Sequence, residues 1–203
     1  GIPAVIVKRT RKIPLYFWVL DLWPESLISA GGVTNKSVIG IFEWITKCLY
    51  NESDKILISS RGFRSSILQK CSVKSKIEYF PNWAEDVFLK KECIDLDNQL
   101  LSDFPAGFIV MFAGNIGEAQ DFESIMKAVL ELKQNTDIKF VFVGDGRKKK
   151  WVDNFIAEHE LNKTCYTLGR YPLELMPLFY KKADIMLVSL KDELIFNLTA
   201  PAK

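Results

Sequence analysis

The sequence predicts an α/β fold made of two Rossmann-like units, each built on a parallel sheet. Short apolar runs alternate with segments whose apolar residues recur at helical spacing, which is typical of strands joined by right-handed helical crossovers. The alternation occurs twice, on either side of the weakly periodic and highly charged residues 84–107, which we interpret as a linker. A hydrophobic content of 48% and a charged content of 26% are ordinary for a globular chain of 203 residues and exclude a disordered one.

The first half, residues 1–83, contains three predicted strands. A continuous apolar run at 13–20 predicts a strand that is buried on both faces, and the polar, proline-containing stretch 21–26 predicts the loop after it. Apolar residues then recur at helical spacing over 37–50. The rest of this half is predicted as a strand at 55–59, a helix at 61–70, a strand at 77–80 and the junction Pro81-Asn82-Trp83.

The second half repeats the alternation more regularly. Its predicted strands lie at 108–113, 139–143, 165–168 and 185–189. The helices between them are marked by apolar faces within 122–132, 151–156 and 173–182. Since strands joined by helical crossovers lie parallel in one sheet, the carboxyl ends of all four strands are expected at the same edge.

Glycine follows three of these strands at the predicted carboxyl edge, which is where ligands bind in parallel α/β sheets. The three glycine loops are Gly114-Asn115-Ile116-Gly117, Gly144-Asp145-Gly146 and Gly169-Arg170-Tyr171. Glycine lets the backbone approach a ligand closely, and a helix that begins after the loop offers N–H groups to a phosphate. The alternative is that the glycines only make tight turns. A dinucleotide site is disfavoured because the third glycine of Gly-x-Gly-x-x-Gly is missing.

Charge, cysteine and histidine content exclude several classes of function. The formal net charge of +2 gives no strong field toward nucleic acid, and the longest uncharged stretch, 104–117, is too short for a bilayer span of roughly 18 residues. The cysteines at 48, 71, 93 and 165 form no Cys-x-x-Cys pair, and His159 is the single histidine, so no zinc site is expected. Unpaired thiols are typical of a cytosolic protein.

Several polar residues have both a structural and a functional interpretation. Asp21 and Glu25 follow a predicted buried strand, where they are either catalytic candidates or ordinary loop and capping residues. The basic run 147–150 opens a predicted helix, where cations oppose the helix dipole unless an anion binds nearby, and the alternative is a solvated face. The 37–50 helix is interpreted as core, with a membrane-facing helix as the alternative because the basic residues of 8–12 precede it.

A set of motifs runs through both halves of the chain. In the first half these are Trp18-Val19-x-Asp21-Leu22-Trp23-Pro24-Glu25-Ser26 and Pro81-Asn82-Trp83. In the second half they are Ala113-Gly114-Asn115-Ile116-Gly117-x-Ala119-Gln120, Val143-Gly144-Asp145-Gly146, Leu168-Gly169-Arg170-Tyr171-Pro172, Ala183-Asp184-Ile185 and Leu198-Thr199-x-Pro201-x-Lys203. Together they resemble the retaining, GT-B-fold glycosyltransferases of family 4. The most similar subgroup builds bacterial capsule and O-antigen and includes N-acetyl-L-fucosamine transferases.

The resemblance implies a GT-B fold, with 1–83 in the acceptor-side domain and 108–203 in the donor-side domain. It implies a UDP-sugar donor, a polyprenyl-diphosphate-linked saccharide acceptor, retention of anomeric configuration, and neither a metal nor another cofactor. The expected location is the cytoplasm, with peripheral attachment to the inner face of the plasma membrane. Asp21 and Glu25 are the catalytic candidates. Donor binding is assigned to Gly114, Asn115, Ile116, Gly117, Gln120, Gly144, Asp145, Gly146, Arg147, Gly169, Arg170, Tyr171, Thr199 and Lys203.

The chain also departs from the family pattern. It would begin inside the first domain and stop inside the second, and it lacks the family's Glu, seven residues, Glu element after the final motif. Both domains are therefore expected to be incomplete, and the chain alone inactive. Asn115 and Gln120 stand where many members have arginine and lysine, so phosphate binding would rest on backbone N–H groups and on Arg147 or Lys203. The alternative functions are a non-catalytic module that binds a nucleotide or sugar phosphate, and an interaction domain without a ligand.

Overall fold

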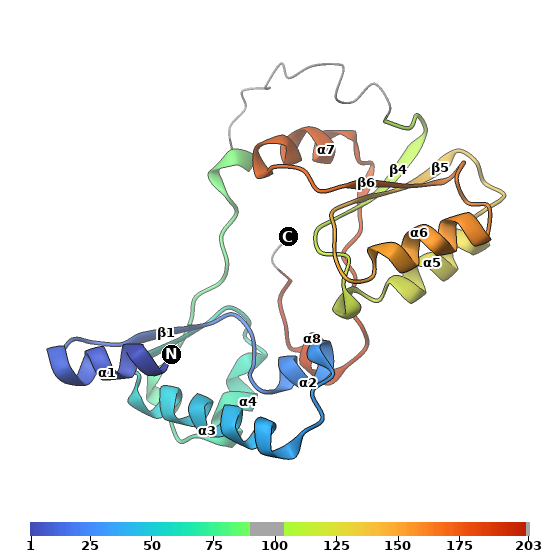
Figure 1. Cartoon of the computed structure of the whole chain (residues 1–203). Coiled ribbons are helices and arrows are strands. Elements are labelled where there is room, and N and C mark those ends of the chain that lie inside the picture. The colour runs from blue at the N-terminus through green and yellow to red at the C-terminus, as the bar shows by residue number, and fades with distance from the viewer. Residues whose placement is uncertain (90–103, 202–203) are drawn as a thin grey trace. The chain divides into compact units, whose positions relative to one another are not determined.

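A computed structural model describes residues 1–89 and 104–201, which divide between two compact units (Figure 1). The first unit contains Gly1–Trp83 together with the end of the chain from Asp192, and the second contains Ala84–Lys191. Each unit holds one sheet, and every strand pairing in both sheets is parallel. The predicted α/β class with parallel sheets is confirmed.

The first sheet has the strand order β1-β2-β3. Its strands are β1 (Tyr16–Val19), β2 (Lys55–Ile58) and β3 (Ile77–Tyr79). The helices of this unit are α1 (Ile2–Arg11), α2 (Glu25–Gly31), α3 (Lys36–Glu52), α4 (Phe63–Lys70) and α8 (Leu194–Asn197), with a 3-10 turn, η1, at Lys74–Lys76. All the strands and helices predicted for this half are present, each within one to three residues of its predicted bounds.

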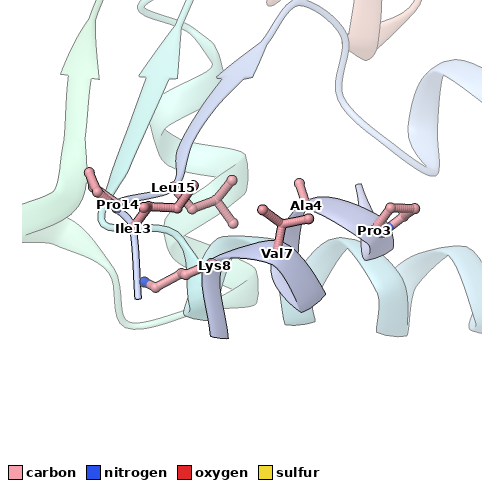
Figure 2. Close-up of a pocket in the computed structure, with 7 residues that line it drawn as sticks. All are labelled: Pro3, Ala4, Val7, Lys8, Ile13, Pro14 and Leu15. Carbon is pink, nitrogen blue, oxygen red and sulfur yellow. The ribbon is translucent and has the colours of Figure 1, made fainter. Parts of the chain in front are cut away.

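Three helices of the first unit, α1, α2 and α8, fall in stretches where the sequence predicts none. None of them has a side-chain N-cap, and α1 is rich in β-branched residues, so local propensity gives little signal. Tertiary contacts hold α1 instead: Lys8 pairs with Asp54 at 2.8 Å, and Arg9 pairs with Glu52 at 2.5 Å. A shallow apolar pocket of about 270 Å³ lies between α1 and residues 13–15 (Figure 2).

The two faces of the first sheet differ in how they are covered. On one face the ring of Phe17 lies 5.9 Å from the ring of Tyr50 in α3. On the other face Tyr16 is 62% exposed and Lys55 beside it forms a surface salt bridge. The prediction of a strand over 13–20 that is buried on both faces is therefore wrong. Aromatic residues count as apolar in a sequence pattern but tolerate exposure, so the pattern does not reveal an open face.

An aromatic cluster lies on the open face. Trp18 stacks on Trp83 with ring centroids 5.1 Å apart and planes inclined by 16°, and Phe80 lies edge-on to both rings. The indole N–H of Trp18 also donates to the carbonyl of Phe80 at 3.3 Å. These contacts fix the junction after β3 onto the sheet.

The 37–50 segment is helical, but its apolar face is only partly core. α3 begins at Lys36 because the side chain of Asn35 accepts hydrogen bonds from the next amides of the helix. The second half of the helix contributes Thr46, Leu49 and Tyr50 to the interior. In the first half Val38, Ile41 and Trp44 are 36%, 58% and 66% exposed, which corrects their interpretation as core.

The second sheet has the strand order β6-β5-β4-β7. Its strands are β4 (Phe108–Ala113), β5 (Ile138–Val143), β6 (Cys165–Gly169) and β7 (Ile185–Met186). Its helices are α5 (Phe122–Glu131), α6 (Lys149–Glu158) and α7 (Met176–Lys182), and its 3-10 turns are η2 (Asp86–Phe88), η3 (Glu118–Gln120) and η4 (Leu173–Leu175). Every predicted element of this half is present, although the predicted helix 173–182 is divided into η4 and α7, and β7 is shorter than its prediction.

The central strands β4 and β5 are buried on both faces, as parallel strands usually are. On the face toward α5 and α6, Phe122 meets Phe112 and Phe142 edge to face, with centroids 4.9 and 5.4 Å apart. On the opposite face Met111 and the side chain of Phe179 in α7 belong to a separate buried cluster. This double layer holds the carboxyl ends of the strands, and the loops that follow them, in fixed positions.

The boundaries of the two units differ from the predicted domains. The described parts of the predicted linker, 84–89 and 104–107, belong to the second unit and contact α7. These contacts are Phe88 with Tyr180 and Phe104 with Phe179. The tail, described for 192–201, lies in the first unit, whereas the predicted donor-side domain at 108–203 includes it.

Three of the cysteines, Cys48, Cys71 and Cys165, are free thiols, and Cys93 lies outside the described residues. Burial raises the pKa of the Cys165 thiol to about 12, so this group stays protonated and unreactive. Over 1–89 and 104–201, no helix combines the length and the apolar character that crossing a bilayer requires.

Candidate functional site

The carboxyl edge of the second sheet is where its topology favours a ligand. Strands β4, β5 and β6 follow one another in one direction, whereas β7 returns to the other side of β4. The strand order therefore reverses at β4, and ligands of open α/β sheets bind beyond the strand ends at such a point. The first glycine loop, 114–120, follows β4 directly.

Backbone hydrogen bonds join the three glycine loops to one another. The amide of Ile116 donates to the carbonyl of Asp145 at 2.9 Å, and the amide of Gly144 donates to the carbonyl of Gly169 at 2.7 Å. The side chain of Ile116 is fully buried in the core beneath. The structure thus brings the predicted residues of 114–117, 144–146 and 169 together at one edge.

Gly144 is required by the contact between loops. It has a φ of +146°, and a Cβ at this position would lie 1.8 Å from the carbonyl oxygen of Gly114. A side chain there is excluded by the neighbouring backbone rather than by a ligand. The alternative interpretation of the glycines, as residues that shape the backbone, is therefore correct at this position.

The N–H groups of the loops are largely used inside the protein. The predicted phosphate donors Gly114, Ile116, Gly117, Gly144 and Gly146 each donate to a protein oxygen. The side-chain oxygen of Gln120 accepts a hydrogen bond from the backbone amide of Gly117 at 3.2 Å. It also lies 3.5 Å from the side-chain nitrogen of Asn115. Asn115 and Gln120 thus stabilise the first loop itself. These backbone amides are therefore already engaged within the protein, which leaves the exposed side-chain cations as the candidates for binding an anion.

Lys148 ties the first loop to the start of α6. Its ammonium group bonds Glu123, lies 3.4 Å from the carboxylate of Glu118 in η3 and sits 5.1 Å from the ring centroid of Trp151. The hydrogen bond from Lys148 to Glu123 raises the pKa of the Lys148 side chain. The next residue, Lys149, pairs with Asp153 at 2.7 Å. Two of the four cations in the basic run 147–150 are therefore held in ion pairs and do not form a purely solvated face.

Lys191, at the end of the run 84–191 that forms the second unit, contacts the same loop. Its amide donates to the carbonyl of Ala119 at 2.9 Å, and its ammonium group lies 3.5 Å from the carboxylate of Glu118. Sequence reasoning identified neither Lys191 nor Glu118, because no local pattern relates residues 73 positions apart. Together with Lys148, they fix the conformation of the first loop.

Arg147 is the cation that remains available beside the glycine loops. It is exposed, and it forms no ion pair within the described residues, whereas Asp145 next to it accepts a hydrogen bond from the amide of Gly146 at 2.7 Å. In the third loop Arg170 is also exposed, but the ring of Tyr171 packs on Phe179 of the core. The chemistry available at this edge is therefore recognition of an anion by Arg147 and Arg170.

The predicted catalytic residues of the first unit have different surroundings. Asp21 follows β1 and is exposed. Glu25 begins α2 and pairs with Lys70 at 2.6 Å, and that lysine also donates to the carbonyl of Trp23 at 2.9 Å. The Lys70 side chain is only 11% exposed, so this ion pair joins α2 to α4. Glu25 therefore has a structural role, as one of the two interpretations of the sequence expects, but through an ion pair and not as a helix cap.

The last two predicted donor-binding residues, Thr199 and Lys203, come from the end of the chain. Thr199 belongs to the tail in the first unit, where its hydroxyl donates to the carbonyl of Ile195 at 2.9 Å. Lys203 lies outside the described residues.

Comparisons with known proteins show which sequences are similar to this chain. Residues 103–194 match the model of the family described as Glycosyl transferases group 1. The probable glycosyltransferase WbjE of Pseudomonas aeruginosa is 28% identical over 196 residues, which cover 92% of this chain and 47% of WbjE. The putative colanic acid biosynthesis glycosyl transferase WcaI of Escherichia coli (strain K12) is 30% identical over 141 residues, which cover 66% of this chain and 33% of WcaI. The chain spans less than half the length of these relatives.

The fold is shared with solved glycosyltransferase structures. Anabaena Alr3699/HepE in complex with UDP-glucose matches with a TM-score of 0.71 and 14% sequence identity, covering 93% of this chain and 50% of that one. At this identity the likeness concerns the fold. Residues 103–194 are therefore similar in sequence to the group 1 glycosyl transferases, and the parallel α/β architecture of the chain resembles that of GT-B glycosyltransferases.

Proposed function

We propose that this chain belongs to a glycosyltransferase that moves a sugar from a UDP-sugar to a lipid-linked saccharide during bacterial surface polysaccharide synthesis. The three glycine loops at the carboxyl edge of the second sheet carry the proposal. They bring an exposed arginine, Arg147, to the point where the strand order reverses, within a segment that is similar to the group 1 glycosyl transferases. The complex of HepE with UDP-glucose supports the donor class, the names of WbjE and WcaI support glycosyl transfer, and the colanic acid biosynthesis named for WcaI supports the pathway.

In the proposed reaction the second unit binds the nucleotide diphosphate and stabilises it as it leaves the sugar. Arg147 neutralises the diphosphate, because its guanidinium group is not engaged by a protein carboxylate. The rigid loops orient the donor, since their backbone groups are already bonded to one another. In the first unit Asp21 interacts with the acceptor hydroxyl, and the anomeric configuration is retained. Glu25 supports α2 rather than the reaction.

The donor is tested by calorimetry of the whole chain with UDP, a UDP-sugar and NAD. We expect UDP to bind and NAD to give no signal. Arg147→Ala should weaken UDP binding about tenfold or more, as expected for the loss of a charge-assisted hydrogen bond. Lys150→Ala is the matched control, because it removes the same charge three residues away at an exposed position in α6. Binding of NAD without UDP, or equal effects of the two substitutions, would overturn the proposal.

Sugar transfer itself distinguishes an enzyme from a binding module. We expect the chain alone to bind UDP without turnover, because positioning of donor and acceptor is worth up to roughly 7–11 kcal/mol of the barrier and the chain spans less than half of its relatives. A longer protein that contains this chain should transfer sugar. UDP binding with no transfer by the longer protein would instead support the non-catalytic nucleotide-binding module.

We also propose peripheral attachment to an anionic membrane through α1 and the residue after it. Lys8 and Arg9 are engaged by Asp54 and Glu52, but Arg11 and Lys12 are exposed without ion pairs among the described residues, as is the apolar side chain of Ile6. Flotation with anionic and neutral liposomes tests this attachment. Recovery only in the soluble fraction with anionic lipid at low salt would contradict it.

A further inference from the structure

The tail of the chain occupies the carboxyl edge of the first sheet. After Lys191 the chain leaves the second unit, and α8 packs beside α2 in the first (Figure 1). Ile195 and Phe196 are buried in this position, at 5% and 9% exposure, whereas Leu194 is 78% exposed. The tail is therefore attached through one side of α8 and not through all its apolar residues.

Two residues of the loop after β2, Ser60 and Gly62, form the seat for this tail. The hydroxyl of Ser60, which is 8% exposed, donates to the carbonyl of Leu198 at 2.5 Å. A Cβ on Gly62 would lie 2.7 Å from the same carbonyl oxygen and 3.0 Å from the Cα of Leu198. We call Ser60 and Gly62 the tail seat.

The glycine of the tail seat has no local reason to be glycine. Its φ of −60° and ψ of −27° are ordinary right-handed helical values, which any residue adopts. The position directly precedes α4, where glycine has no advantage over the usual polar caps. The close approach of the tail backbone is what a side chain at this position would prevent.

The same tail begins at a residue that holds the first glycine loop. Lys191 bonds Ala119 through its amide and lies beside Glu118 through its ammonium group. Only residues 192–194 separate Lys191 from the buried Ile195. A movement of the tail on its seat therefore acts on Lys191 through a very short piece of chain.

We infer that Ser60 and Gly62 are positioning residues, which hold the tail on the carboxyl edge of the first sheet and thereby keep the 114–120 loop, through Lys191, in the conformation that binds the donor. The inference rests on the proposed function for the meaning of that conformation. In this view the two units communicate through the tail: a donor that orders the 114–120 loop also stabilises the tail on its seat, and release of the tail loosens the loop.

Hydrogen exchange of the whole chain without ligand is the first test. Gly62→Ala should raise the exchange rates of amides in 195–198 about tenfold or more, because a Cβ overlaps the tail backbone. The amides of Lys191 and Ile116 should exchange faster as well, while those of β2 keep their wild-type rates. Gly40→Ala is the matched control, since that helical glycine has open space around its Cβ position, and it should leave the tail within about twofold of wild type.

A second pair of variants covers the case in which Gly62→Ala does not fold. Ser60→Ala removes the hydroxyl that bonds the tail and should raise tail exchange about threefold to tenfold. Thr10→Ala removes an exposed hydroxyl of α1 that bonds only the backbone of its own helix, and should have no effect on the tail. Unchanged tail exchange in Ser60→Ala and Gly62→Ala would overturn the seat. Faster tail exchange with an unchanged 114–120 loop would overturn the coupling.

UDP affinity then connects the inference to the proposed function. Calorimetry should show that Gly62→Ala and Ser60→Ala weaken UDP binding several-fold, although both residues lie in the first unit. Failure of the wild-type chain to bind UDP would refute the proposed donor, while the exchange results would still decide whether the tail seat controls the loop. UDP binding that is identical in wild type and variants, with the tail released, would refute the positioning role.

Discussion

The carboxyl edges of the two sheets are held together by different kinds of interaction. In the second unit the edge consists of backbone: three glycine loops whose amides bond one another's carbonyls above a core that is buried on both faces. In the first unit side chains have a larger part: the Glu25–Lys70 ion pair and the hydroxyl of Ser60 help to hold the segments that follow the strands. At the edge of the second unit, a side chain added at Gly144 would overlap the backbone of the neighbouring loop. At the edge of the first unit, substitution of Glu25 or Ser60 removes a side-chain interaction.

This difference suits the proposed roles of the two edges. A donor diphosphate is the same for every UDP-sugar, so a rigid edge with two exposed cations, Arg147 and Arg170, is sufficient for its recognition. An edge held by side chains can be altered by single substitutions without loss of the fold. The predictions below test the contrast in order of decreasing effect.

The largest effect is expected for Gly144→Ala in the second unit. Its Cβ would overlap the carbonyl of Gly114, and its φ of +146° is unfavourable for alanine, so unfolding should require about 3 kcal/mol less free energy than in wild type. UDP binding should be lost. Gly169→Ala is the control that separates the two causes, because it has a φ of +78° but open space around its Cβ position; it should cost only about 1 kcal/mol. Equal losses in urea unfolding would show that backbone strain alone is responsible.

A smaller effect is expected at the edge of the first unit. Glu25→Gln should lower the free energy of unfolding by about 1 kcal/mol, because it weakens a charge-assisted contact with the largely buried ammonium group of Lys70. Asp21→Asn, four residues earlier and exposed, should change stability by less than about 0.5 kcal/mol.

The same two substitutions should affect sugar transfer differently in a longer, active protein. Asp21→Asn should lower turnover far more than UDP affinity, and Glu25→Gln should affect both only through stability. A loss of turnover in Glu25→Gln at full stability would restore Glu25 as a catalytic residue.

Lys148 and Lys191, which we call the clamp, both hold the first glycine loop through ion pairs, and we expect their loss to destabilise the second unit to different degrees. Lys148→Met should destabilise the second unit more than Lys191→Met, by about 1 against about 0.5 kcal/mol, because Lys148 bonds two carboxylates and is less exposed. Both losses should shrink in high salt. If Lys191→Met alone alters hydrogen exchange in the tail, the clamp and the tail seat act together as inferred.

The smallest effect concerns pH and separates the two units. Hydrogen bonds from Arg9 and Lys8 lower the pKa of the Glu52 and Asp54 carboxyls, so the stability that these pairs give α1 is present above the ordinary carboxyl pKa and is lost as pH falls through the lowered values, below about pH 4. The pKa of the Lys148 ammonium group is raised instead, so the stability that this cation gives the 114–120 loop is lost as pH rises above about 10. Amide resonances of α1 should therefore broaden in acid, and Lys148→Met should reduce the loss of stability above about pH 10. Resonances of α1 that stay sharp below about pH 4 would contradict this assignment.

Much of the fold follows from the sequence because the second unit obeys simple patterns. Its strands are continuous apolar runs, its helices have one apolar face, and glycine marks the end of three strands. The first unit was predicted less well because α1, α2 and α8 depend on contacts between distant residues, such as Arg9 with Glu52. The exposure of Trp44 shows the related difficulty that a helical pattern reveals an apolar face but not what covers it.

The sequence predicts that the three glycine loops lie at one edge, but it does not predict the hydrogen bonds that they form with one another. Glycine loops at strand ends are visible in the sequence, and the structure brings them together. Which amides remain available to a phosphate depends on bonds between loops, so the expectation of backbone phosphate binding could not be checked from residue types. Glu118 follows β4 and Lys191 follows β7, so their ion pair depends on the pairing of these two strands, which the sequence does not reveal.

The stacked indoles of Trp18 and Trp83 give the first unit an optical signature of its own. Two indole rings 5.1 Å apart, with planes 16° from parallel, are close enough for their excited states to couple, so the pair should produce a paired positive and negative band in circular dichroism of the aromatic region. The other three tryptophans pack against phenylalanine or are exposed. A spectroscopist can therefore follow the junction after β3 during unfolding or ligand titration, without attaching any label.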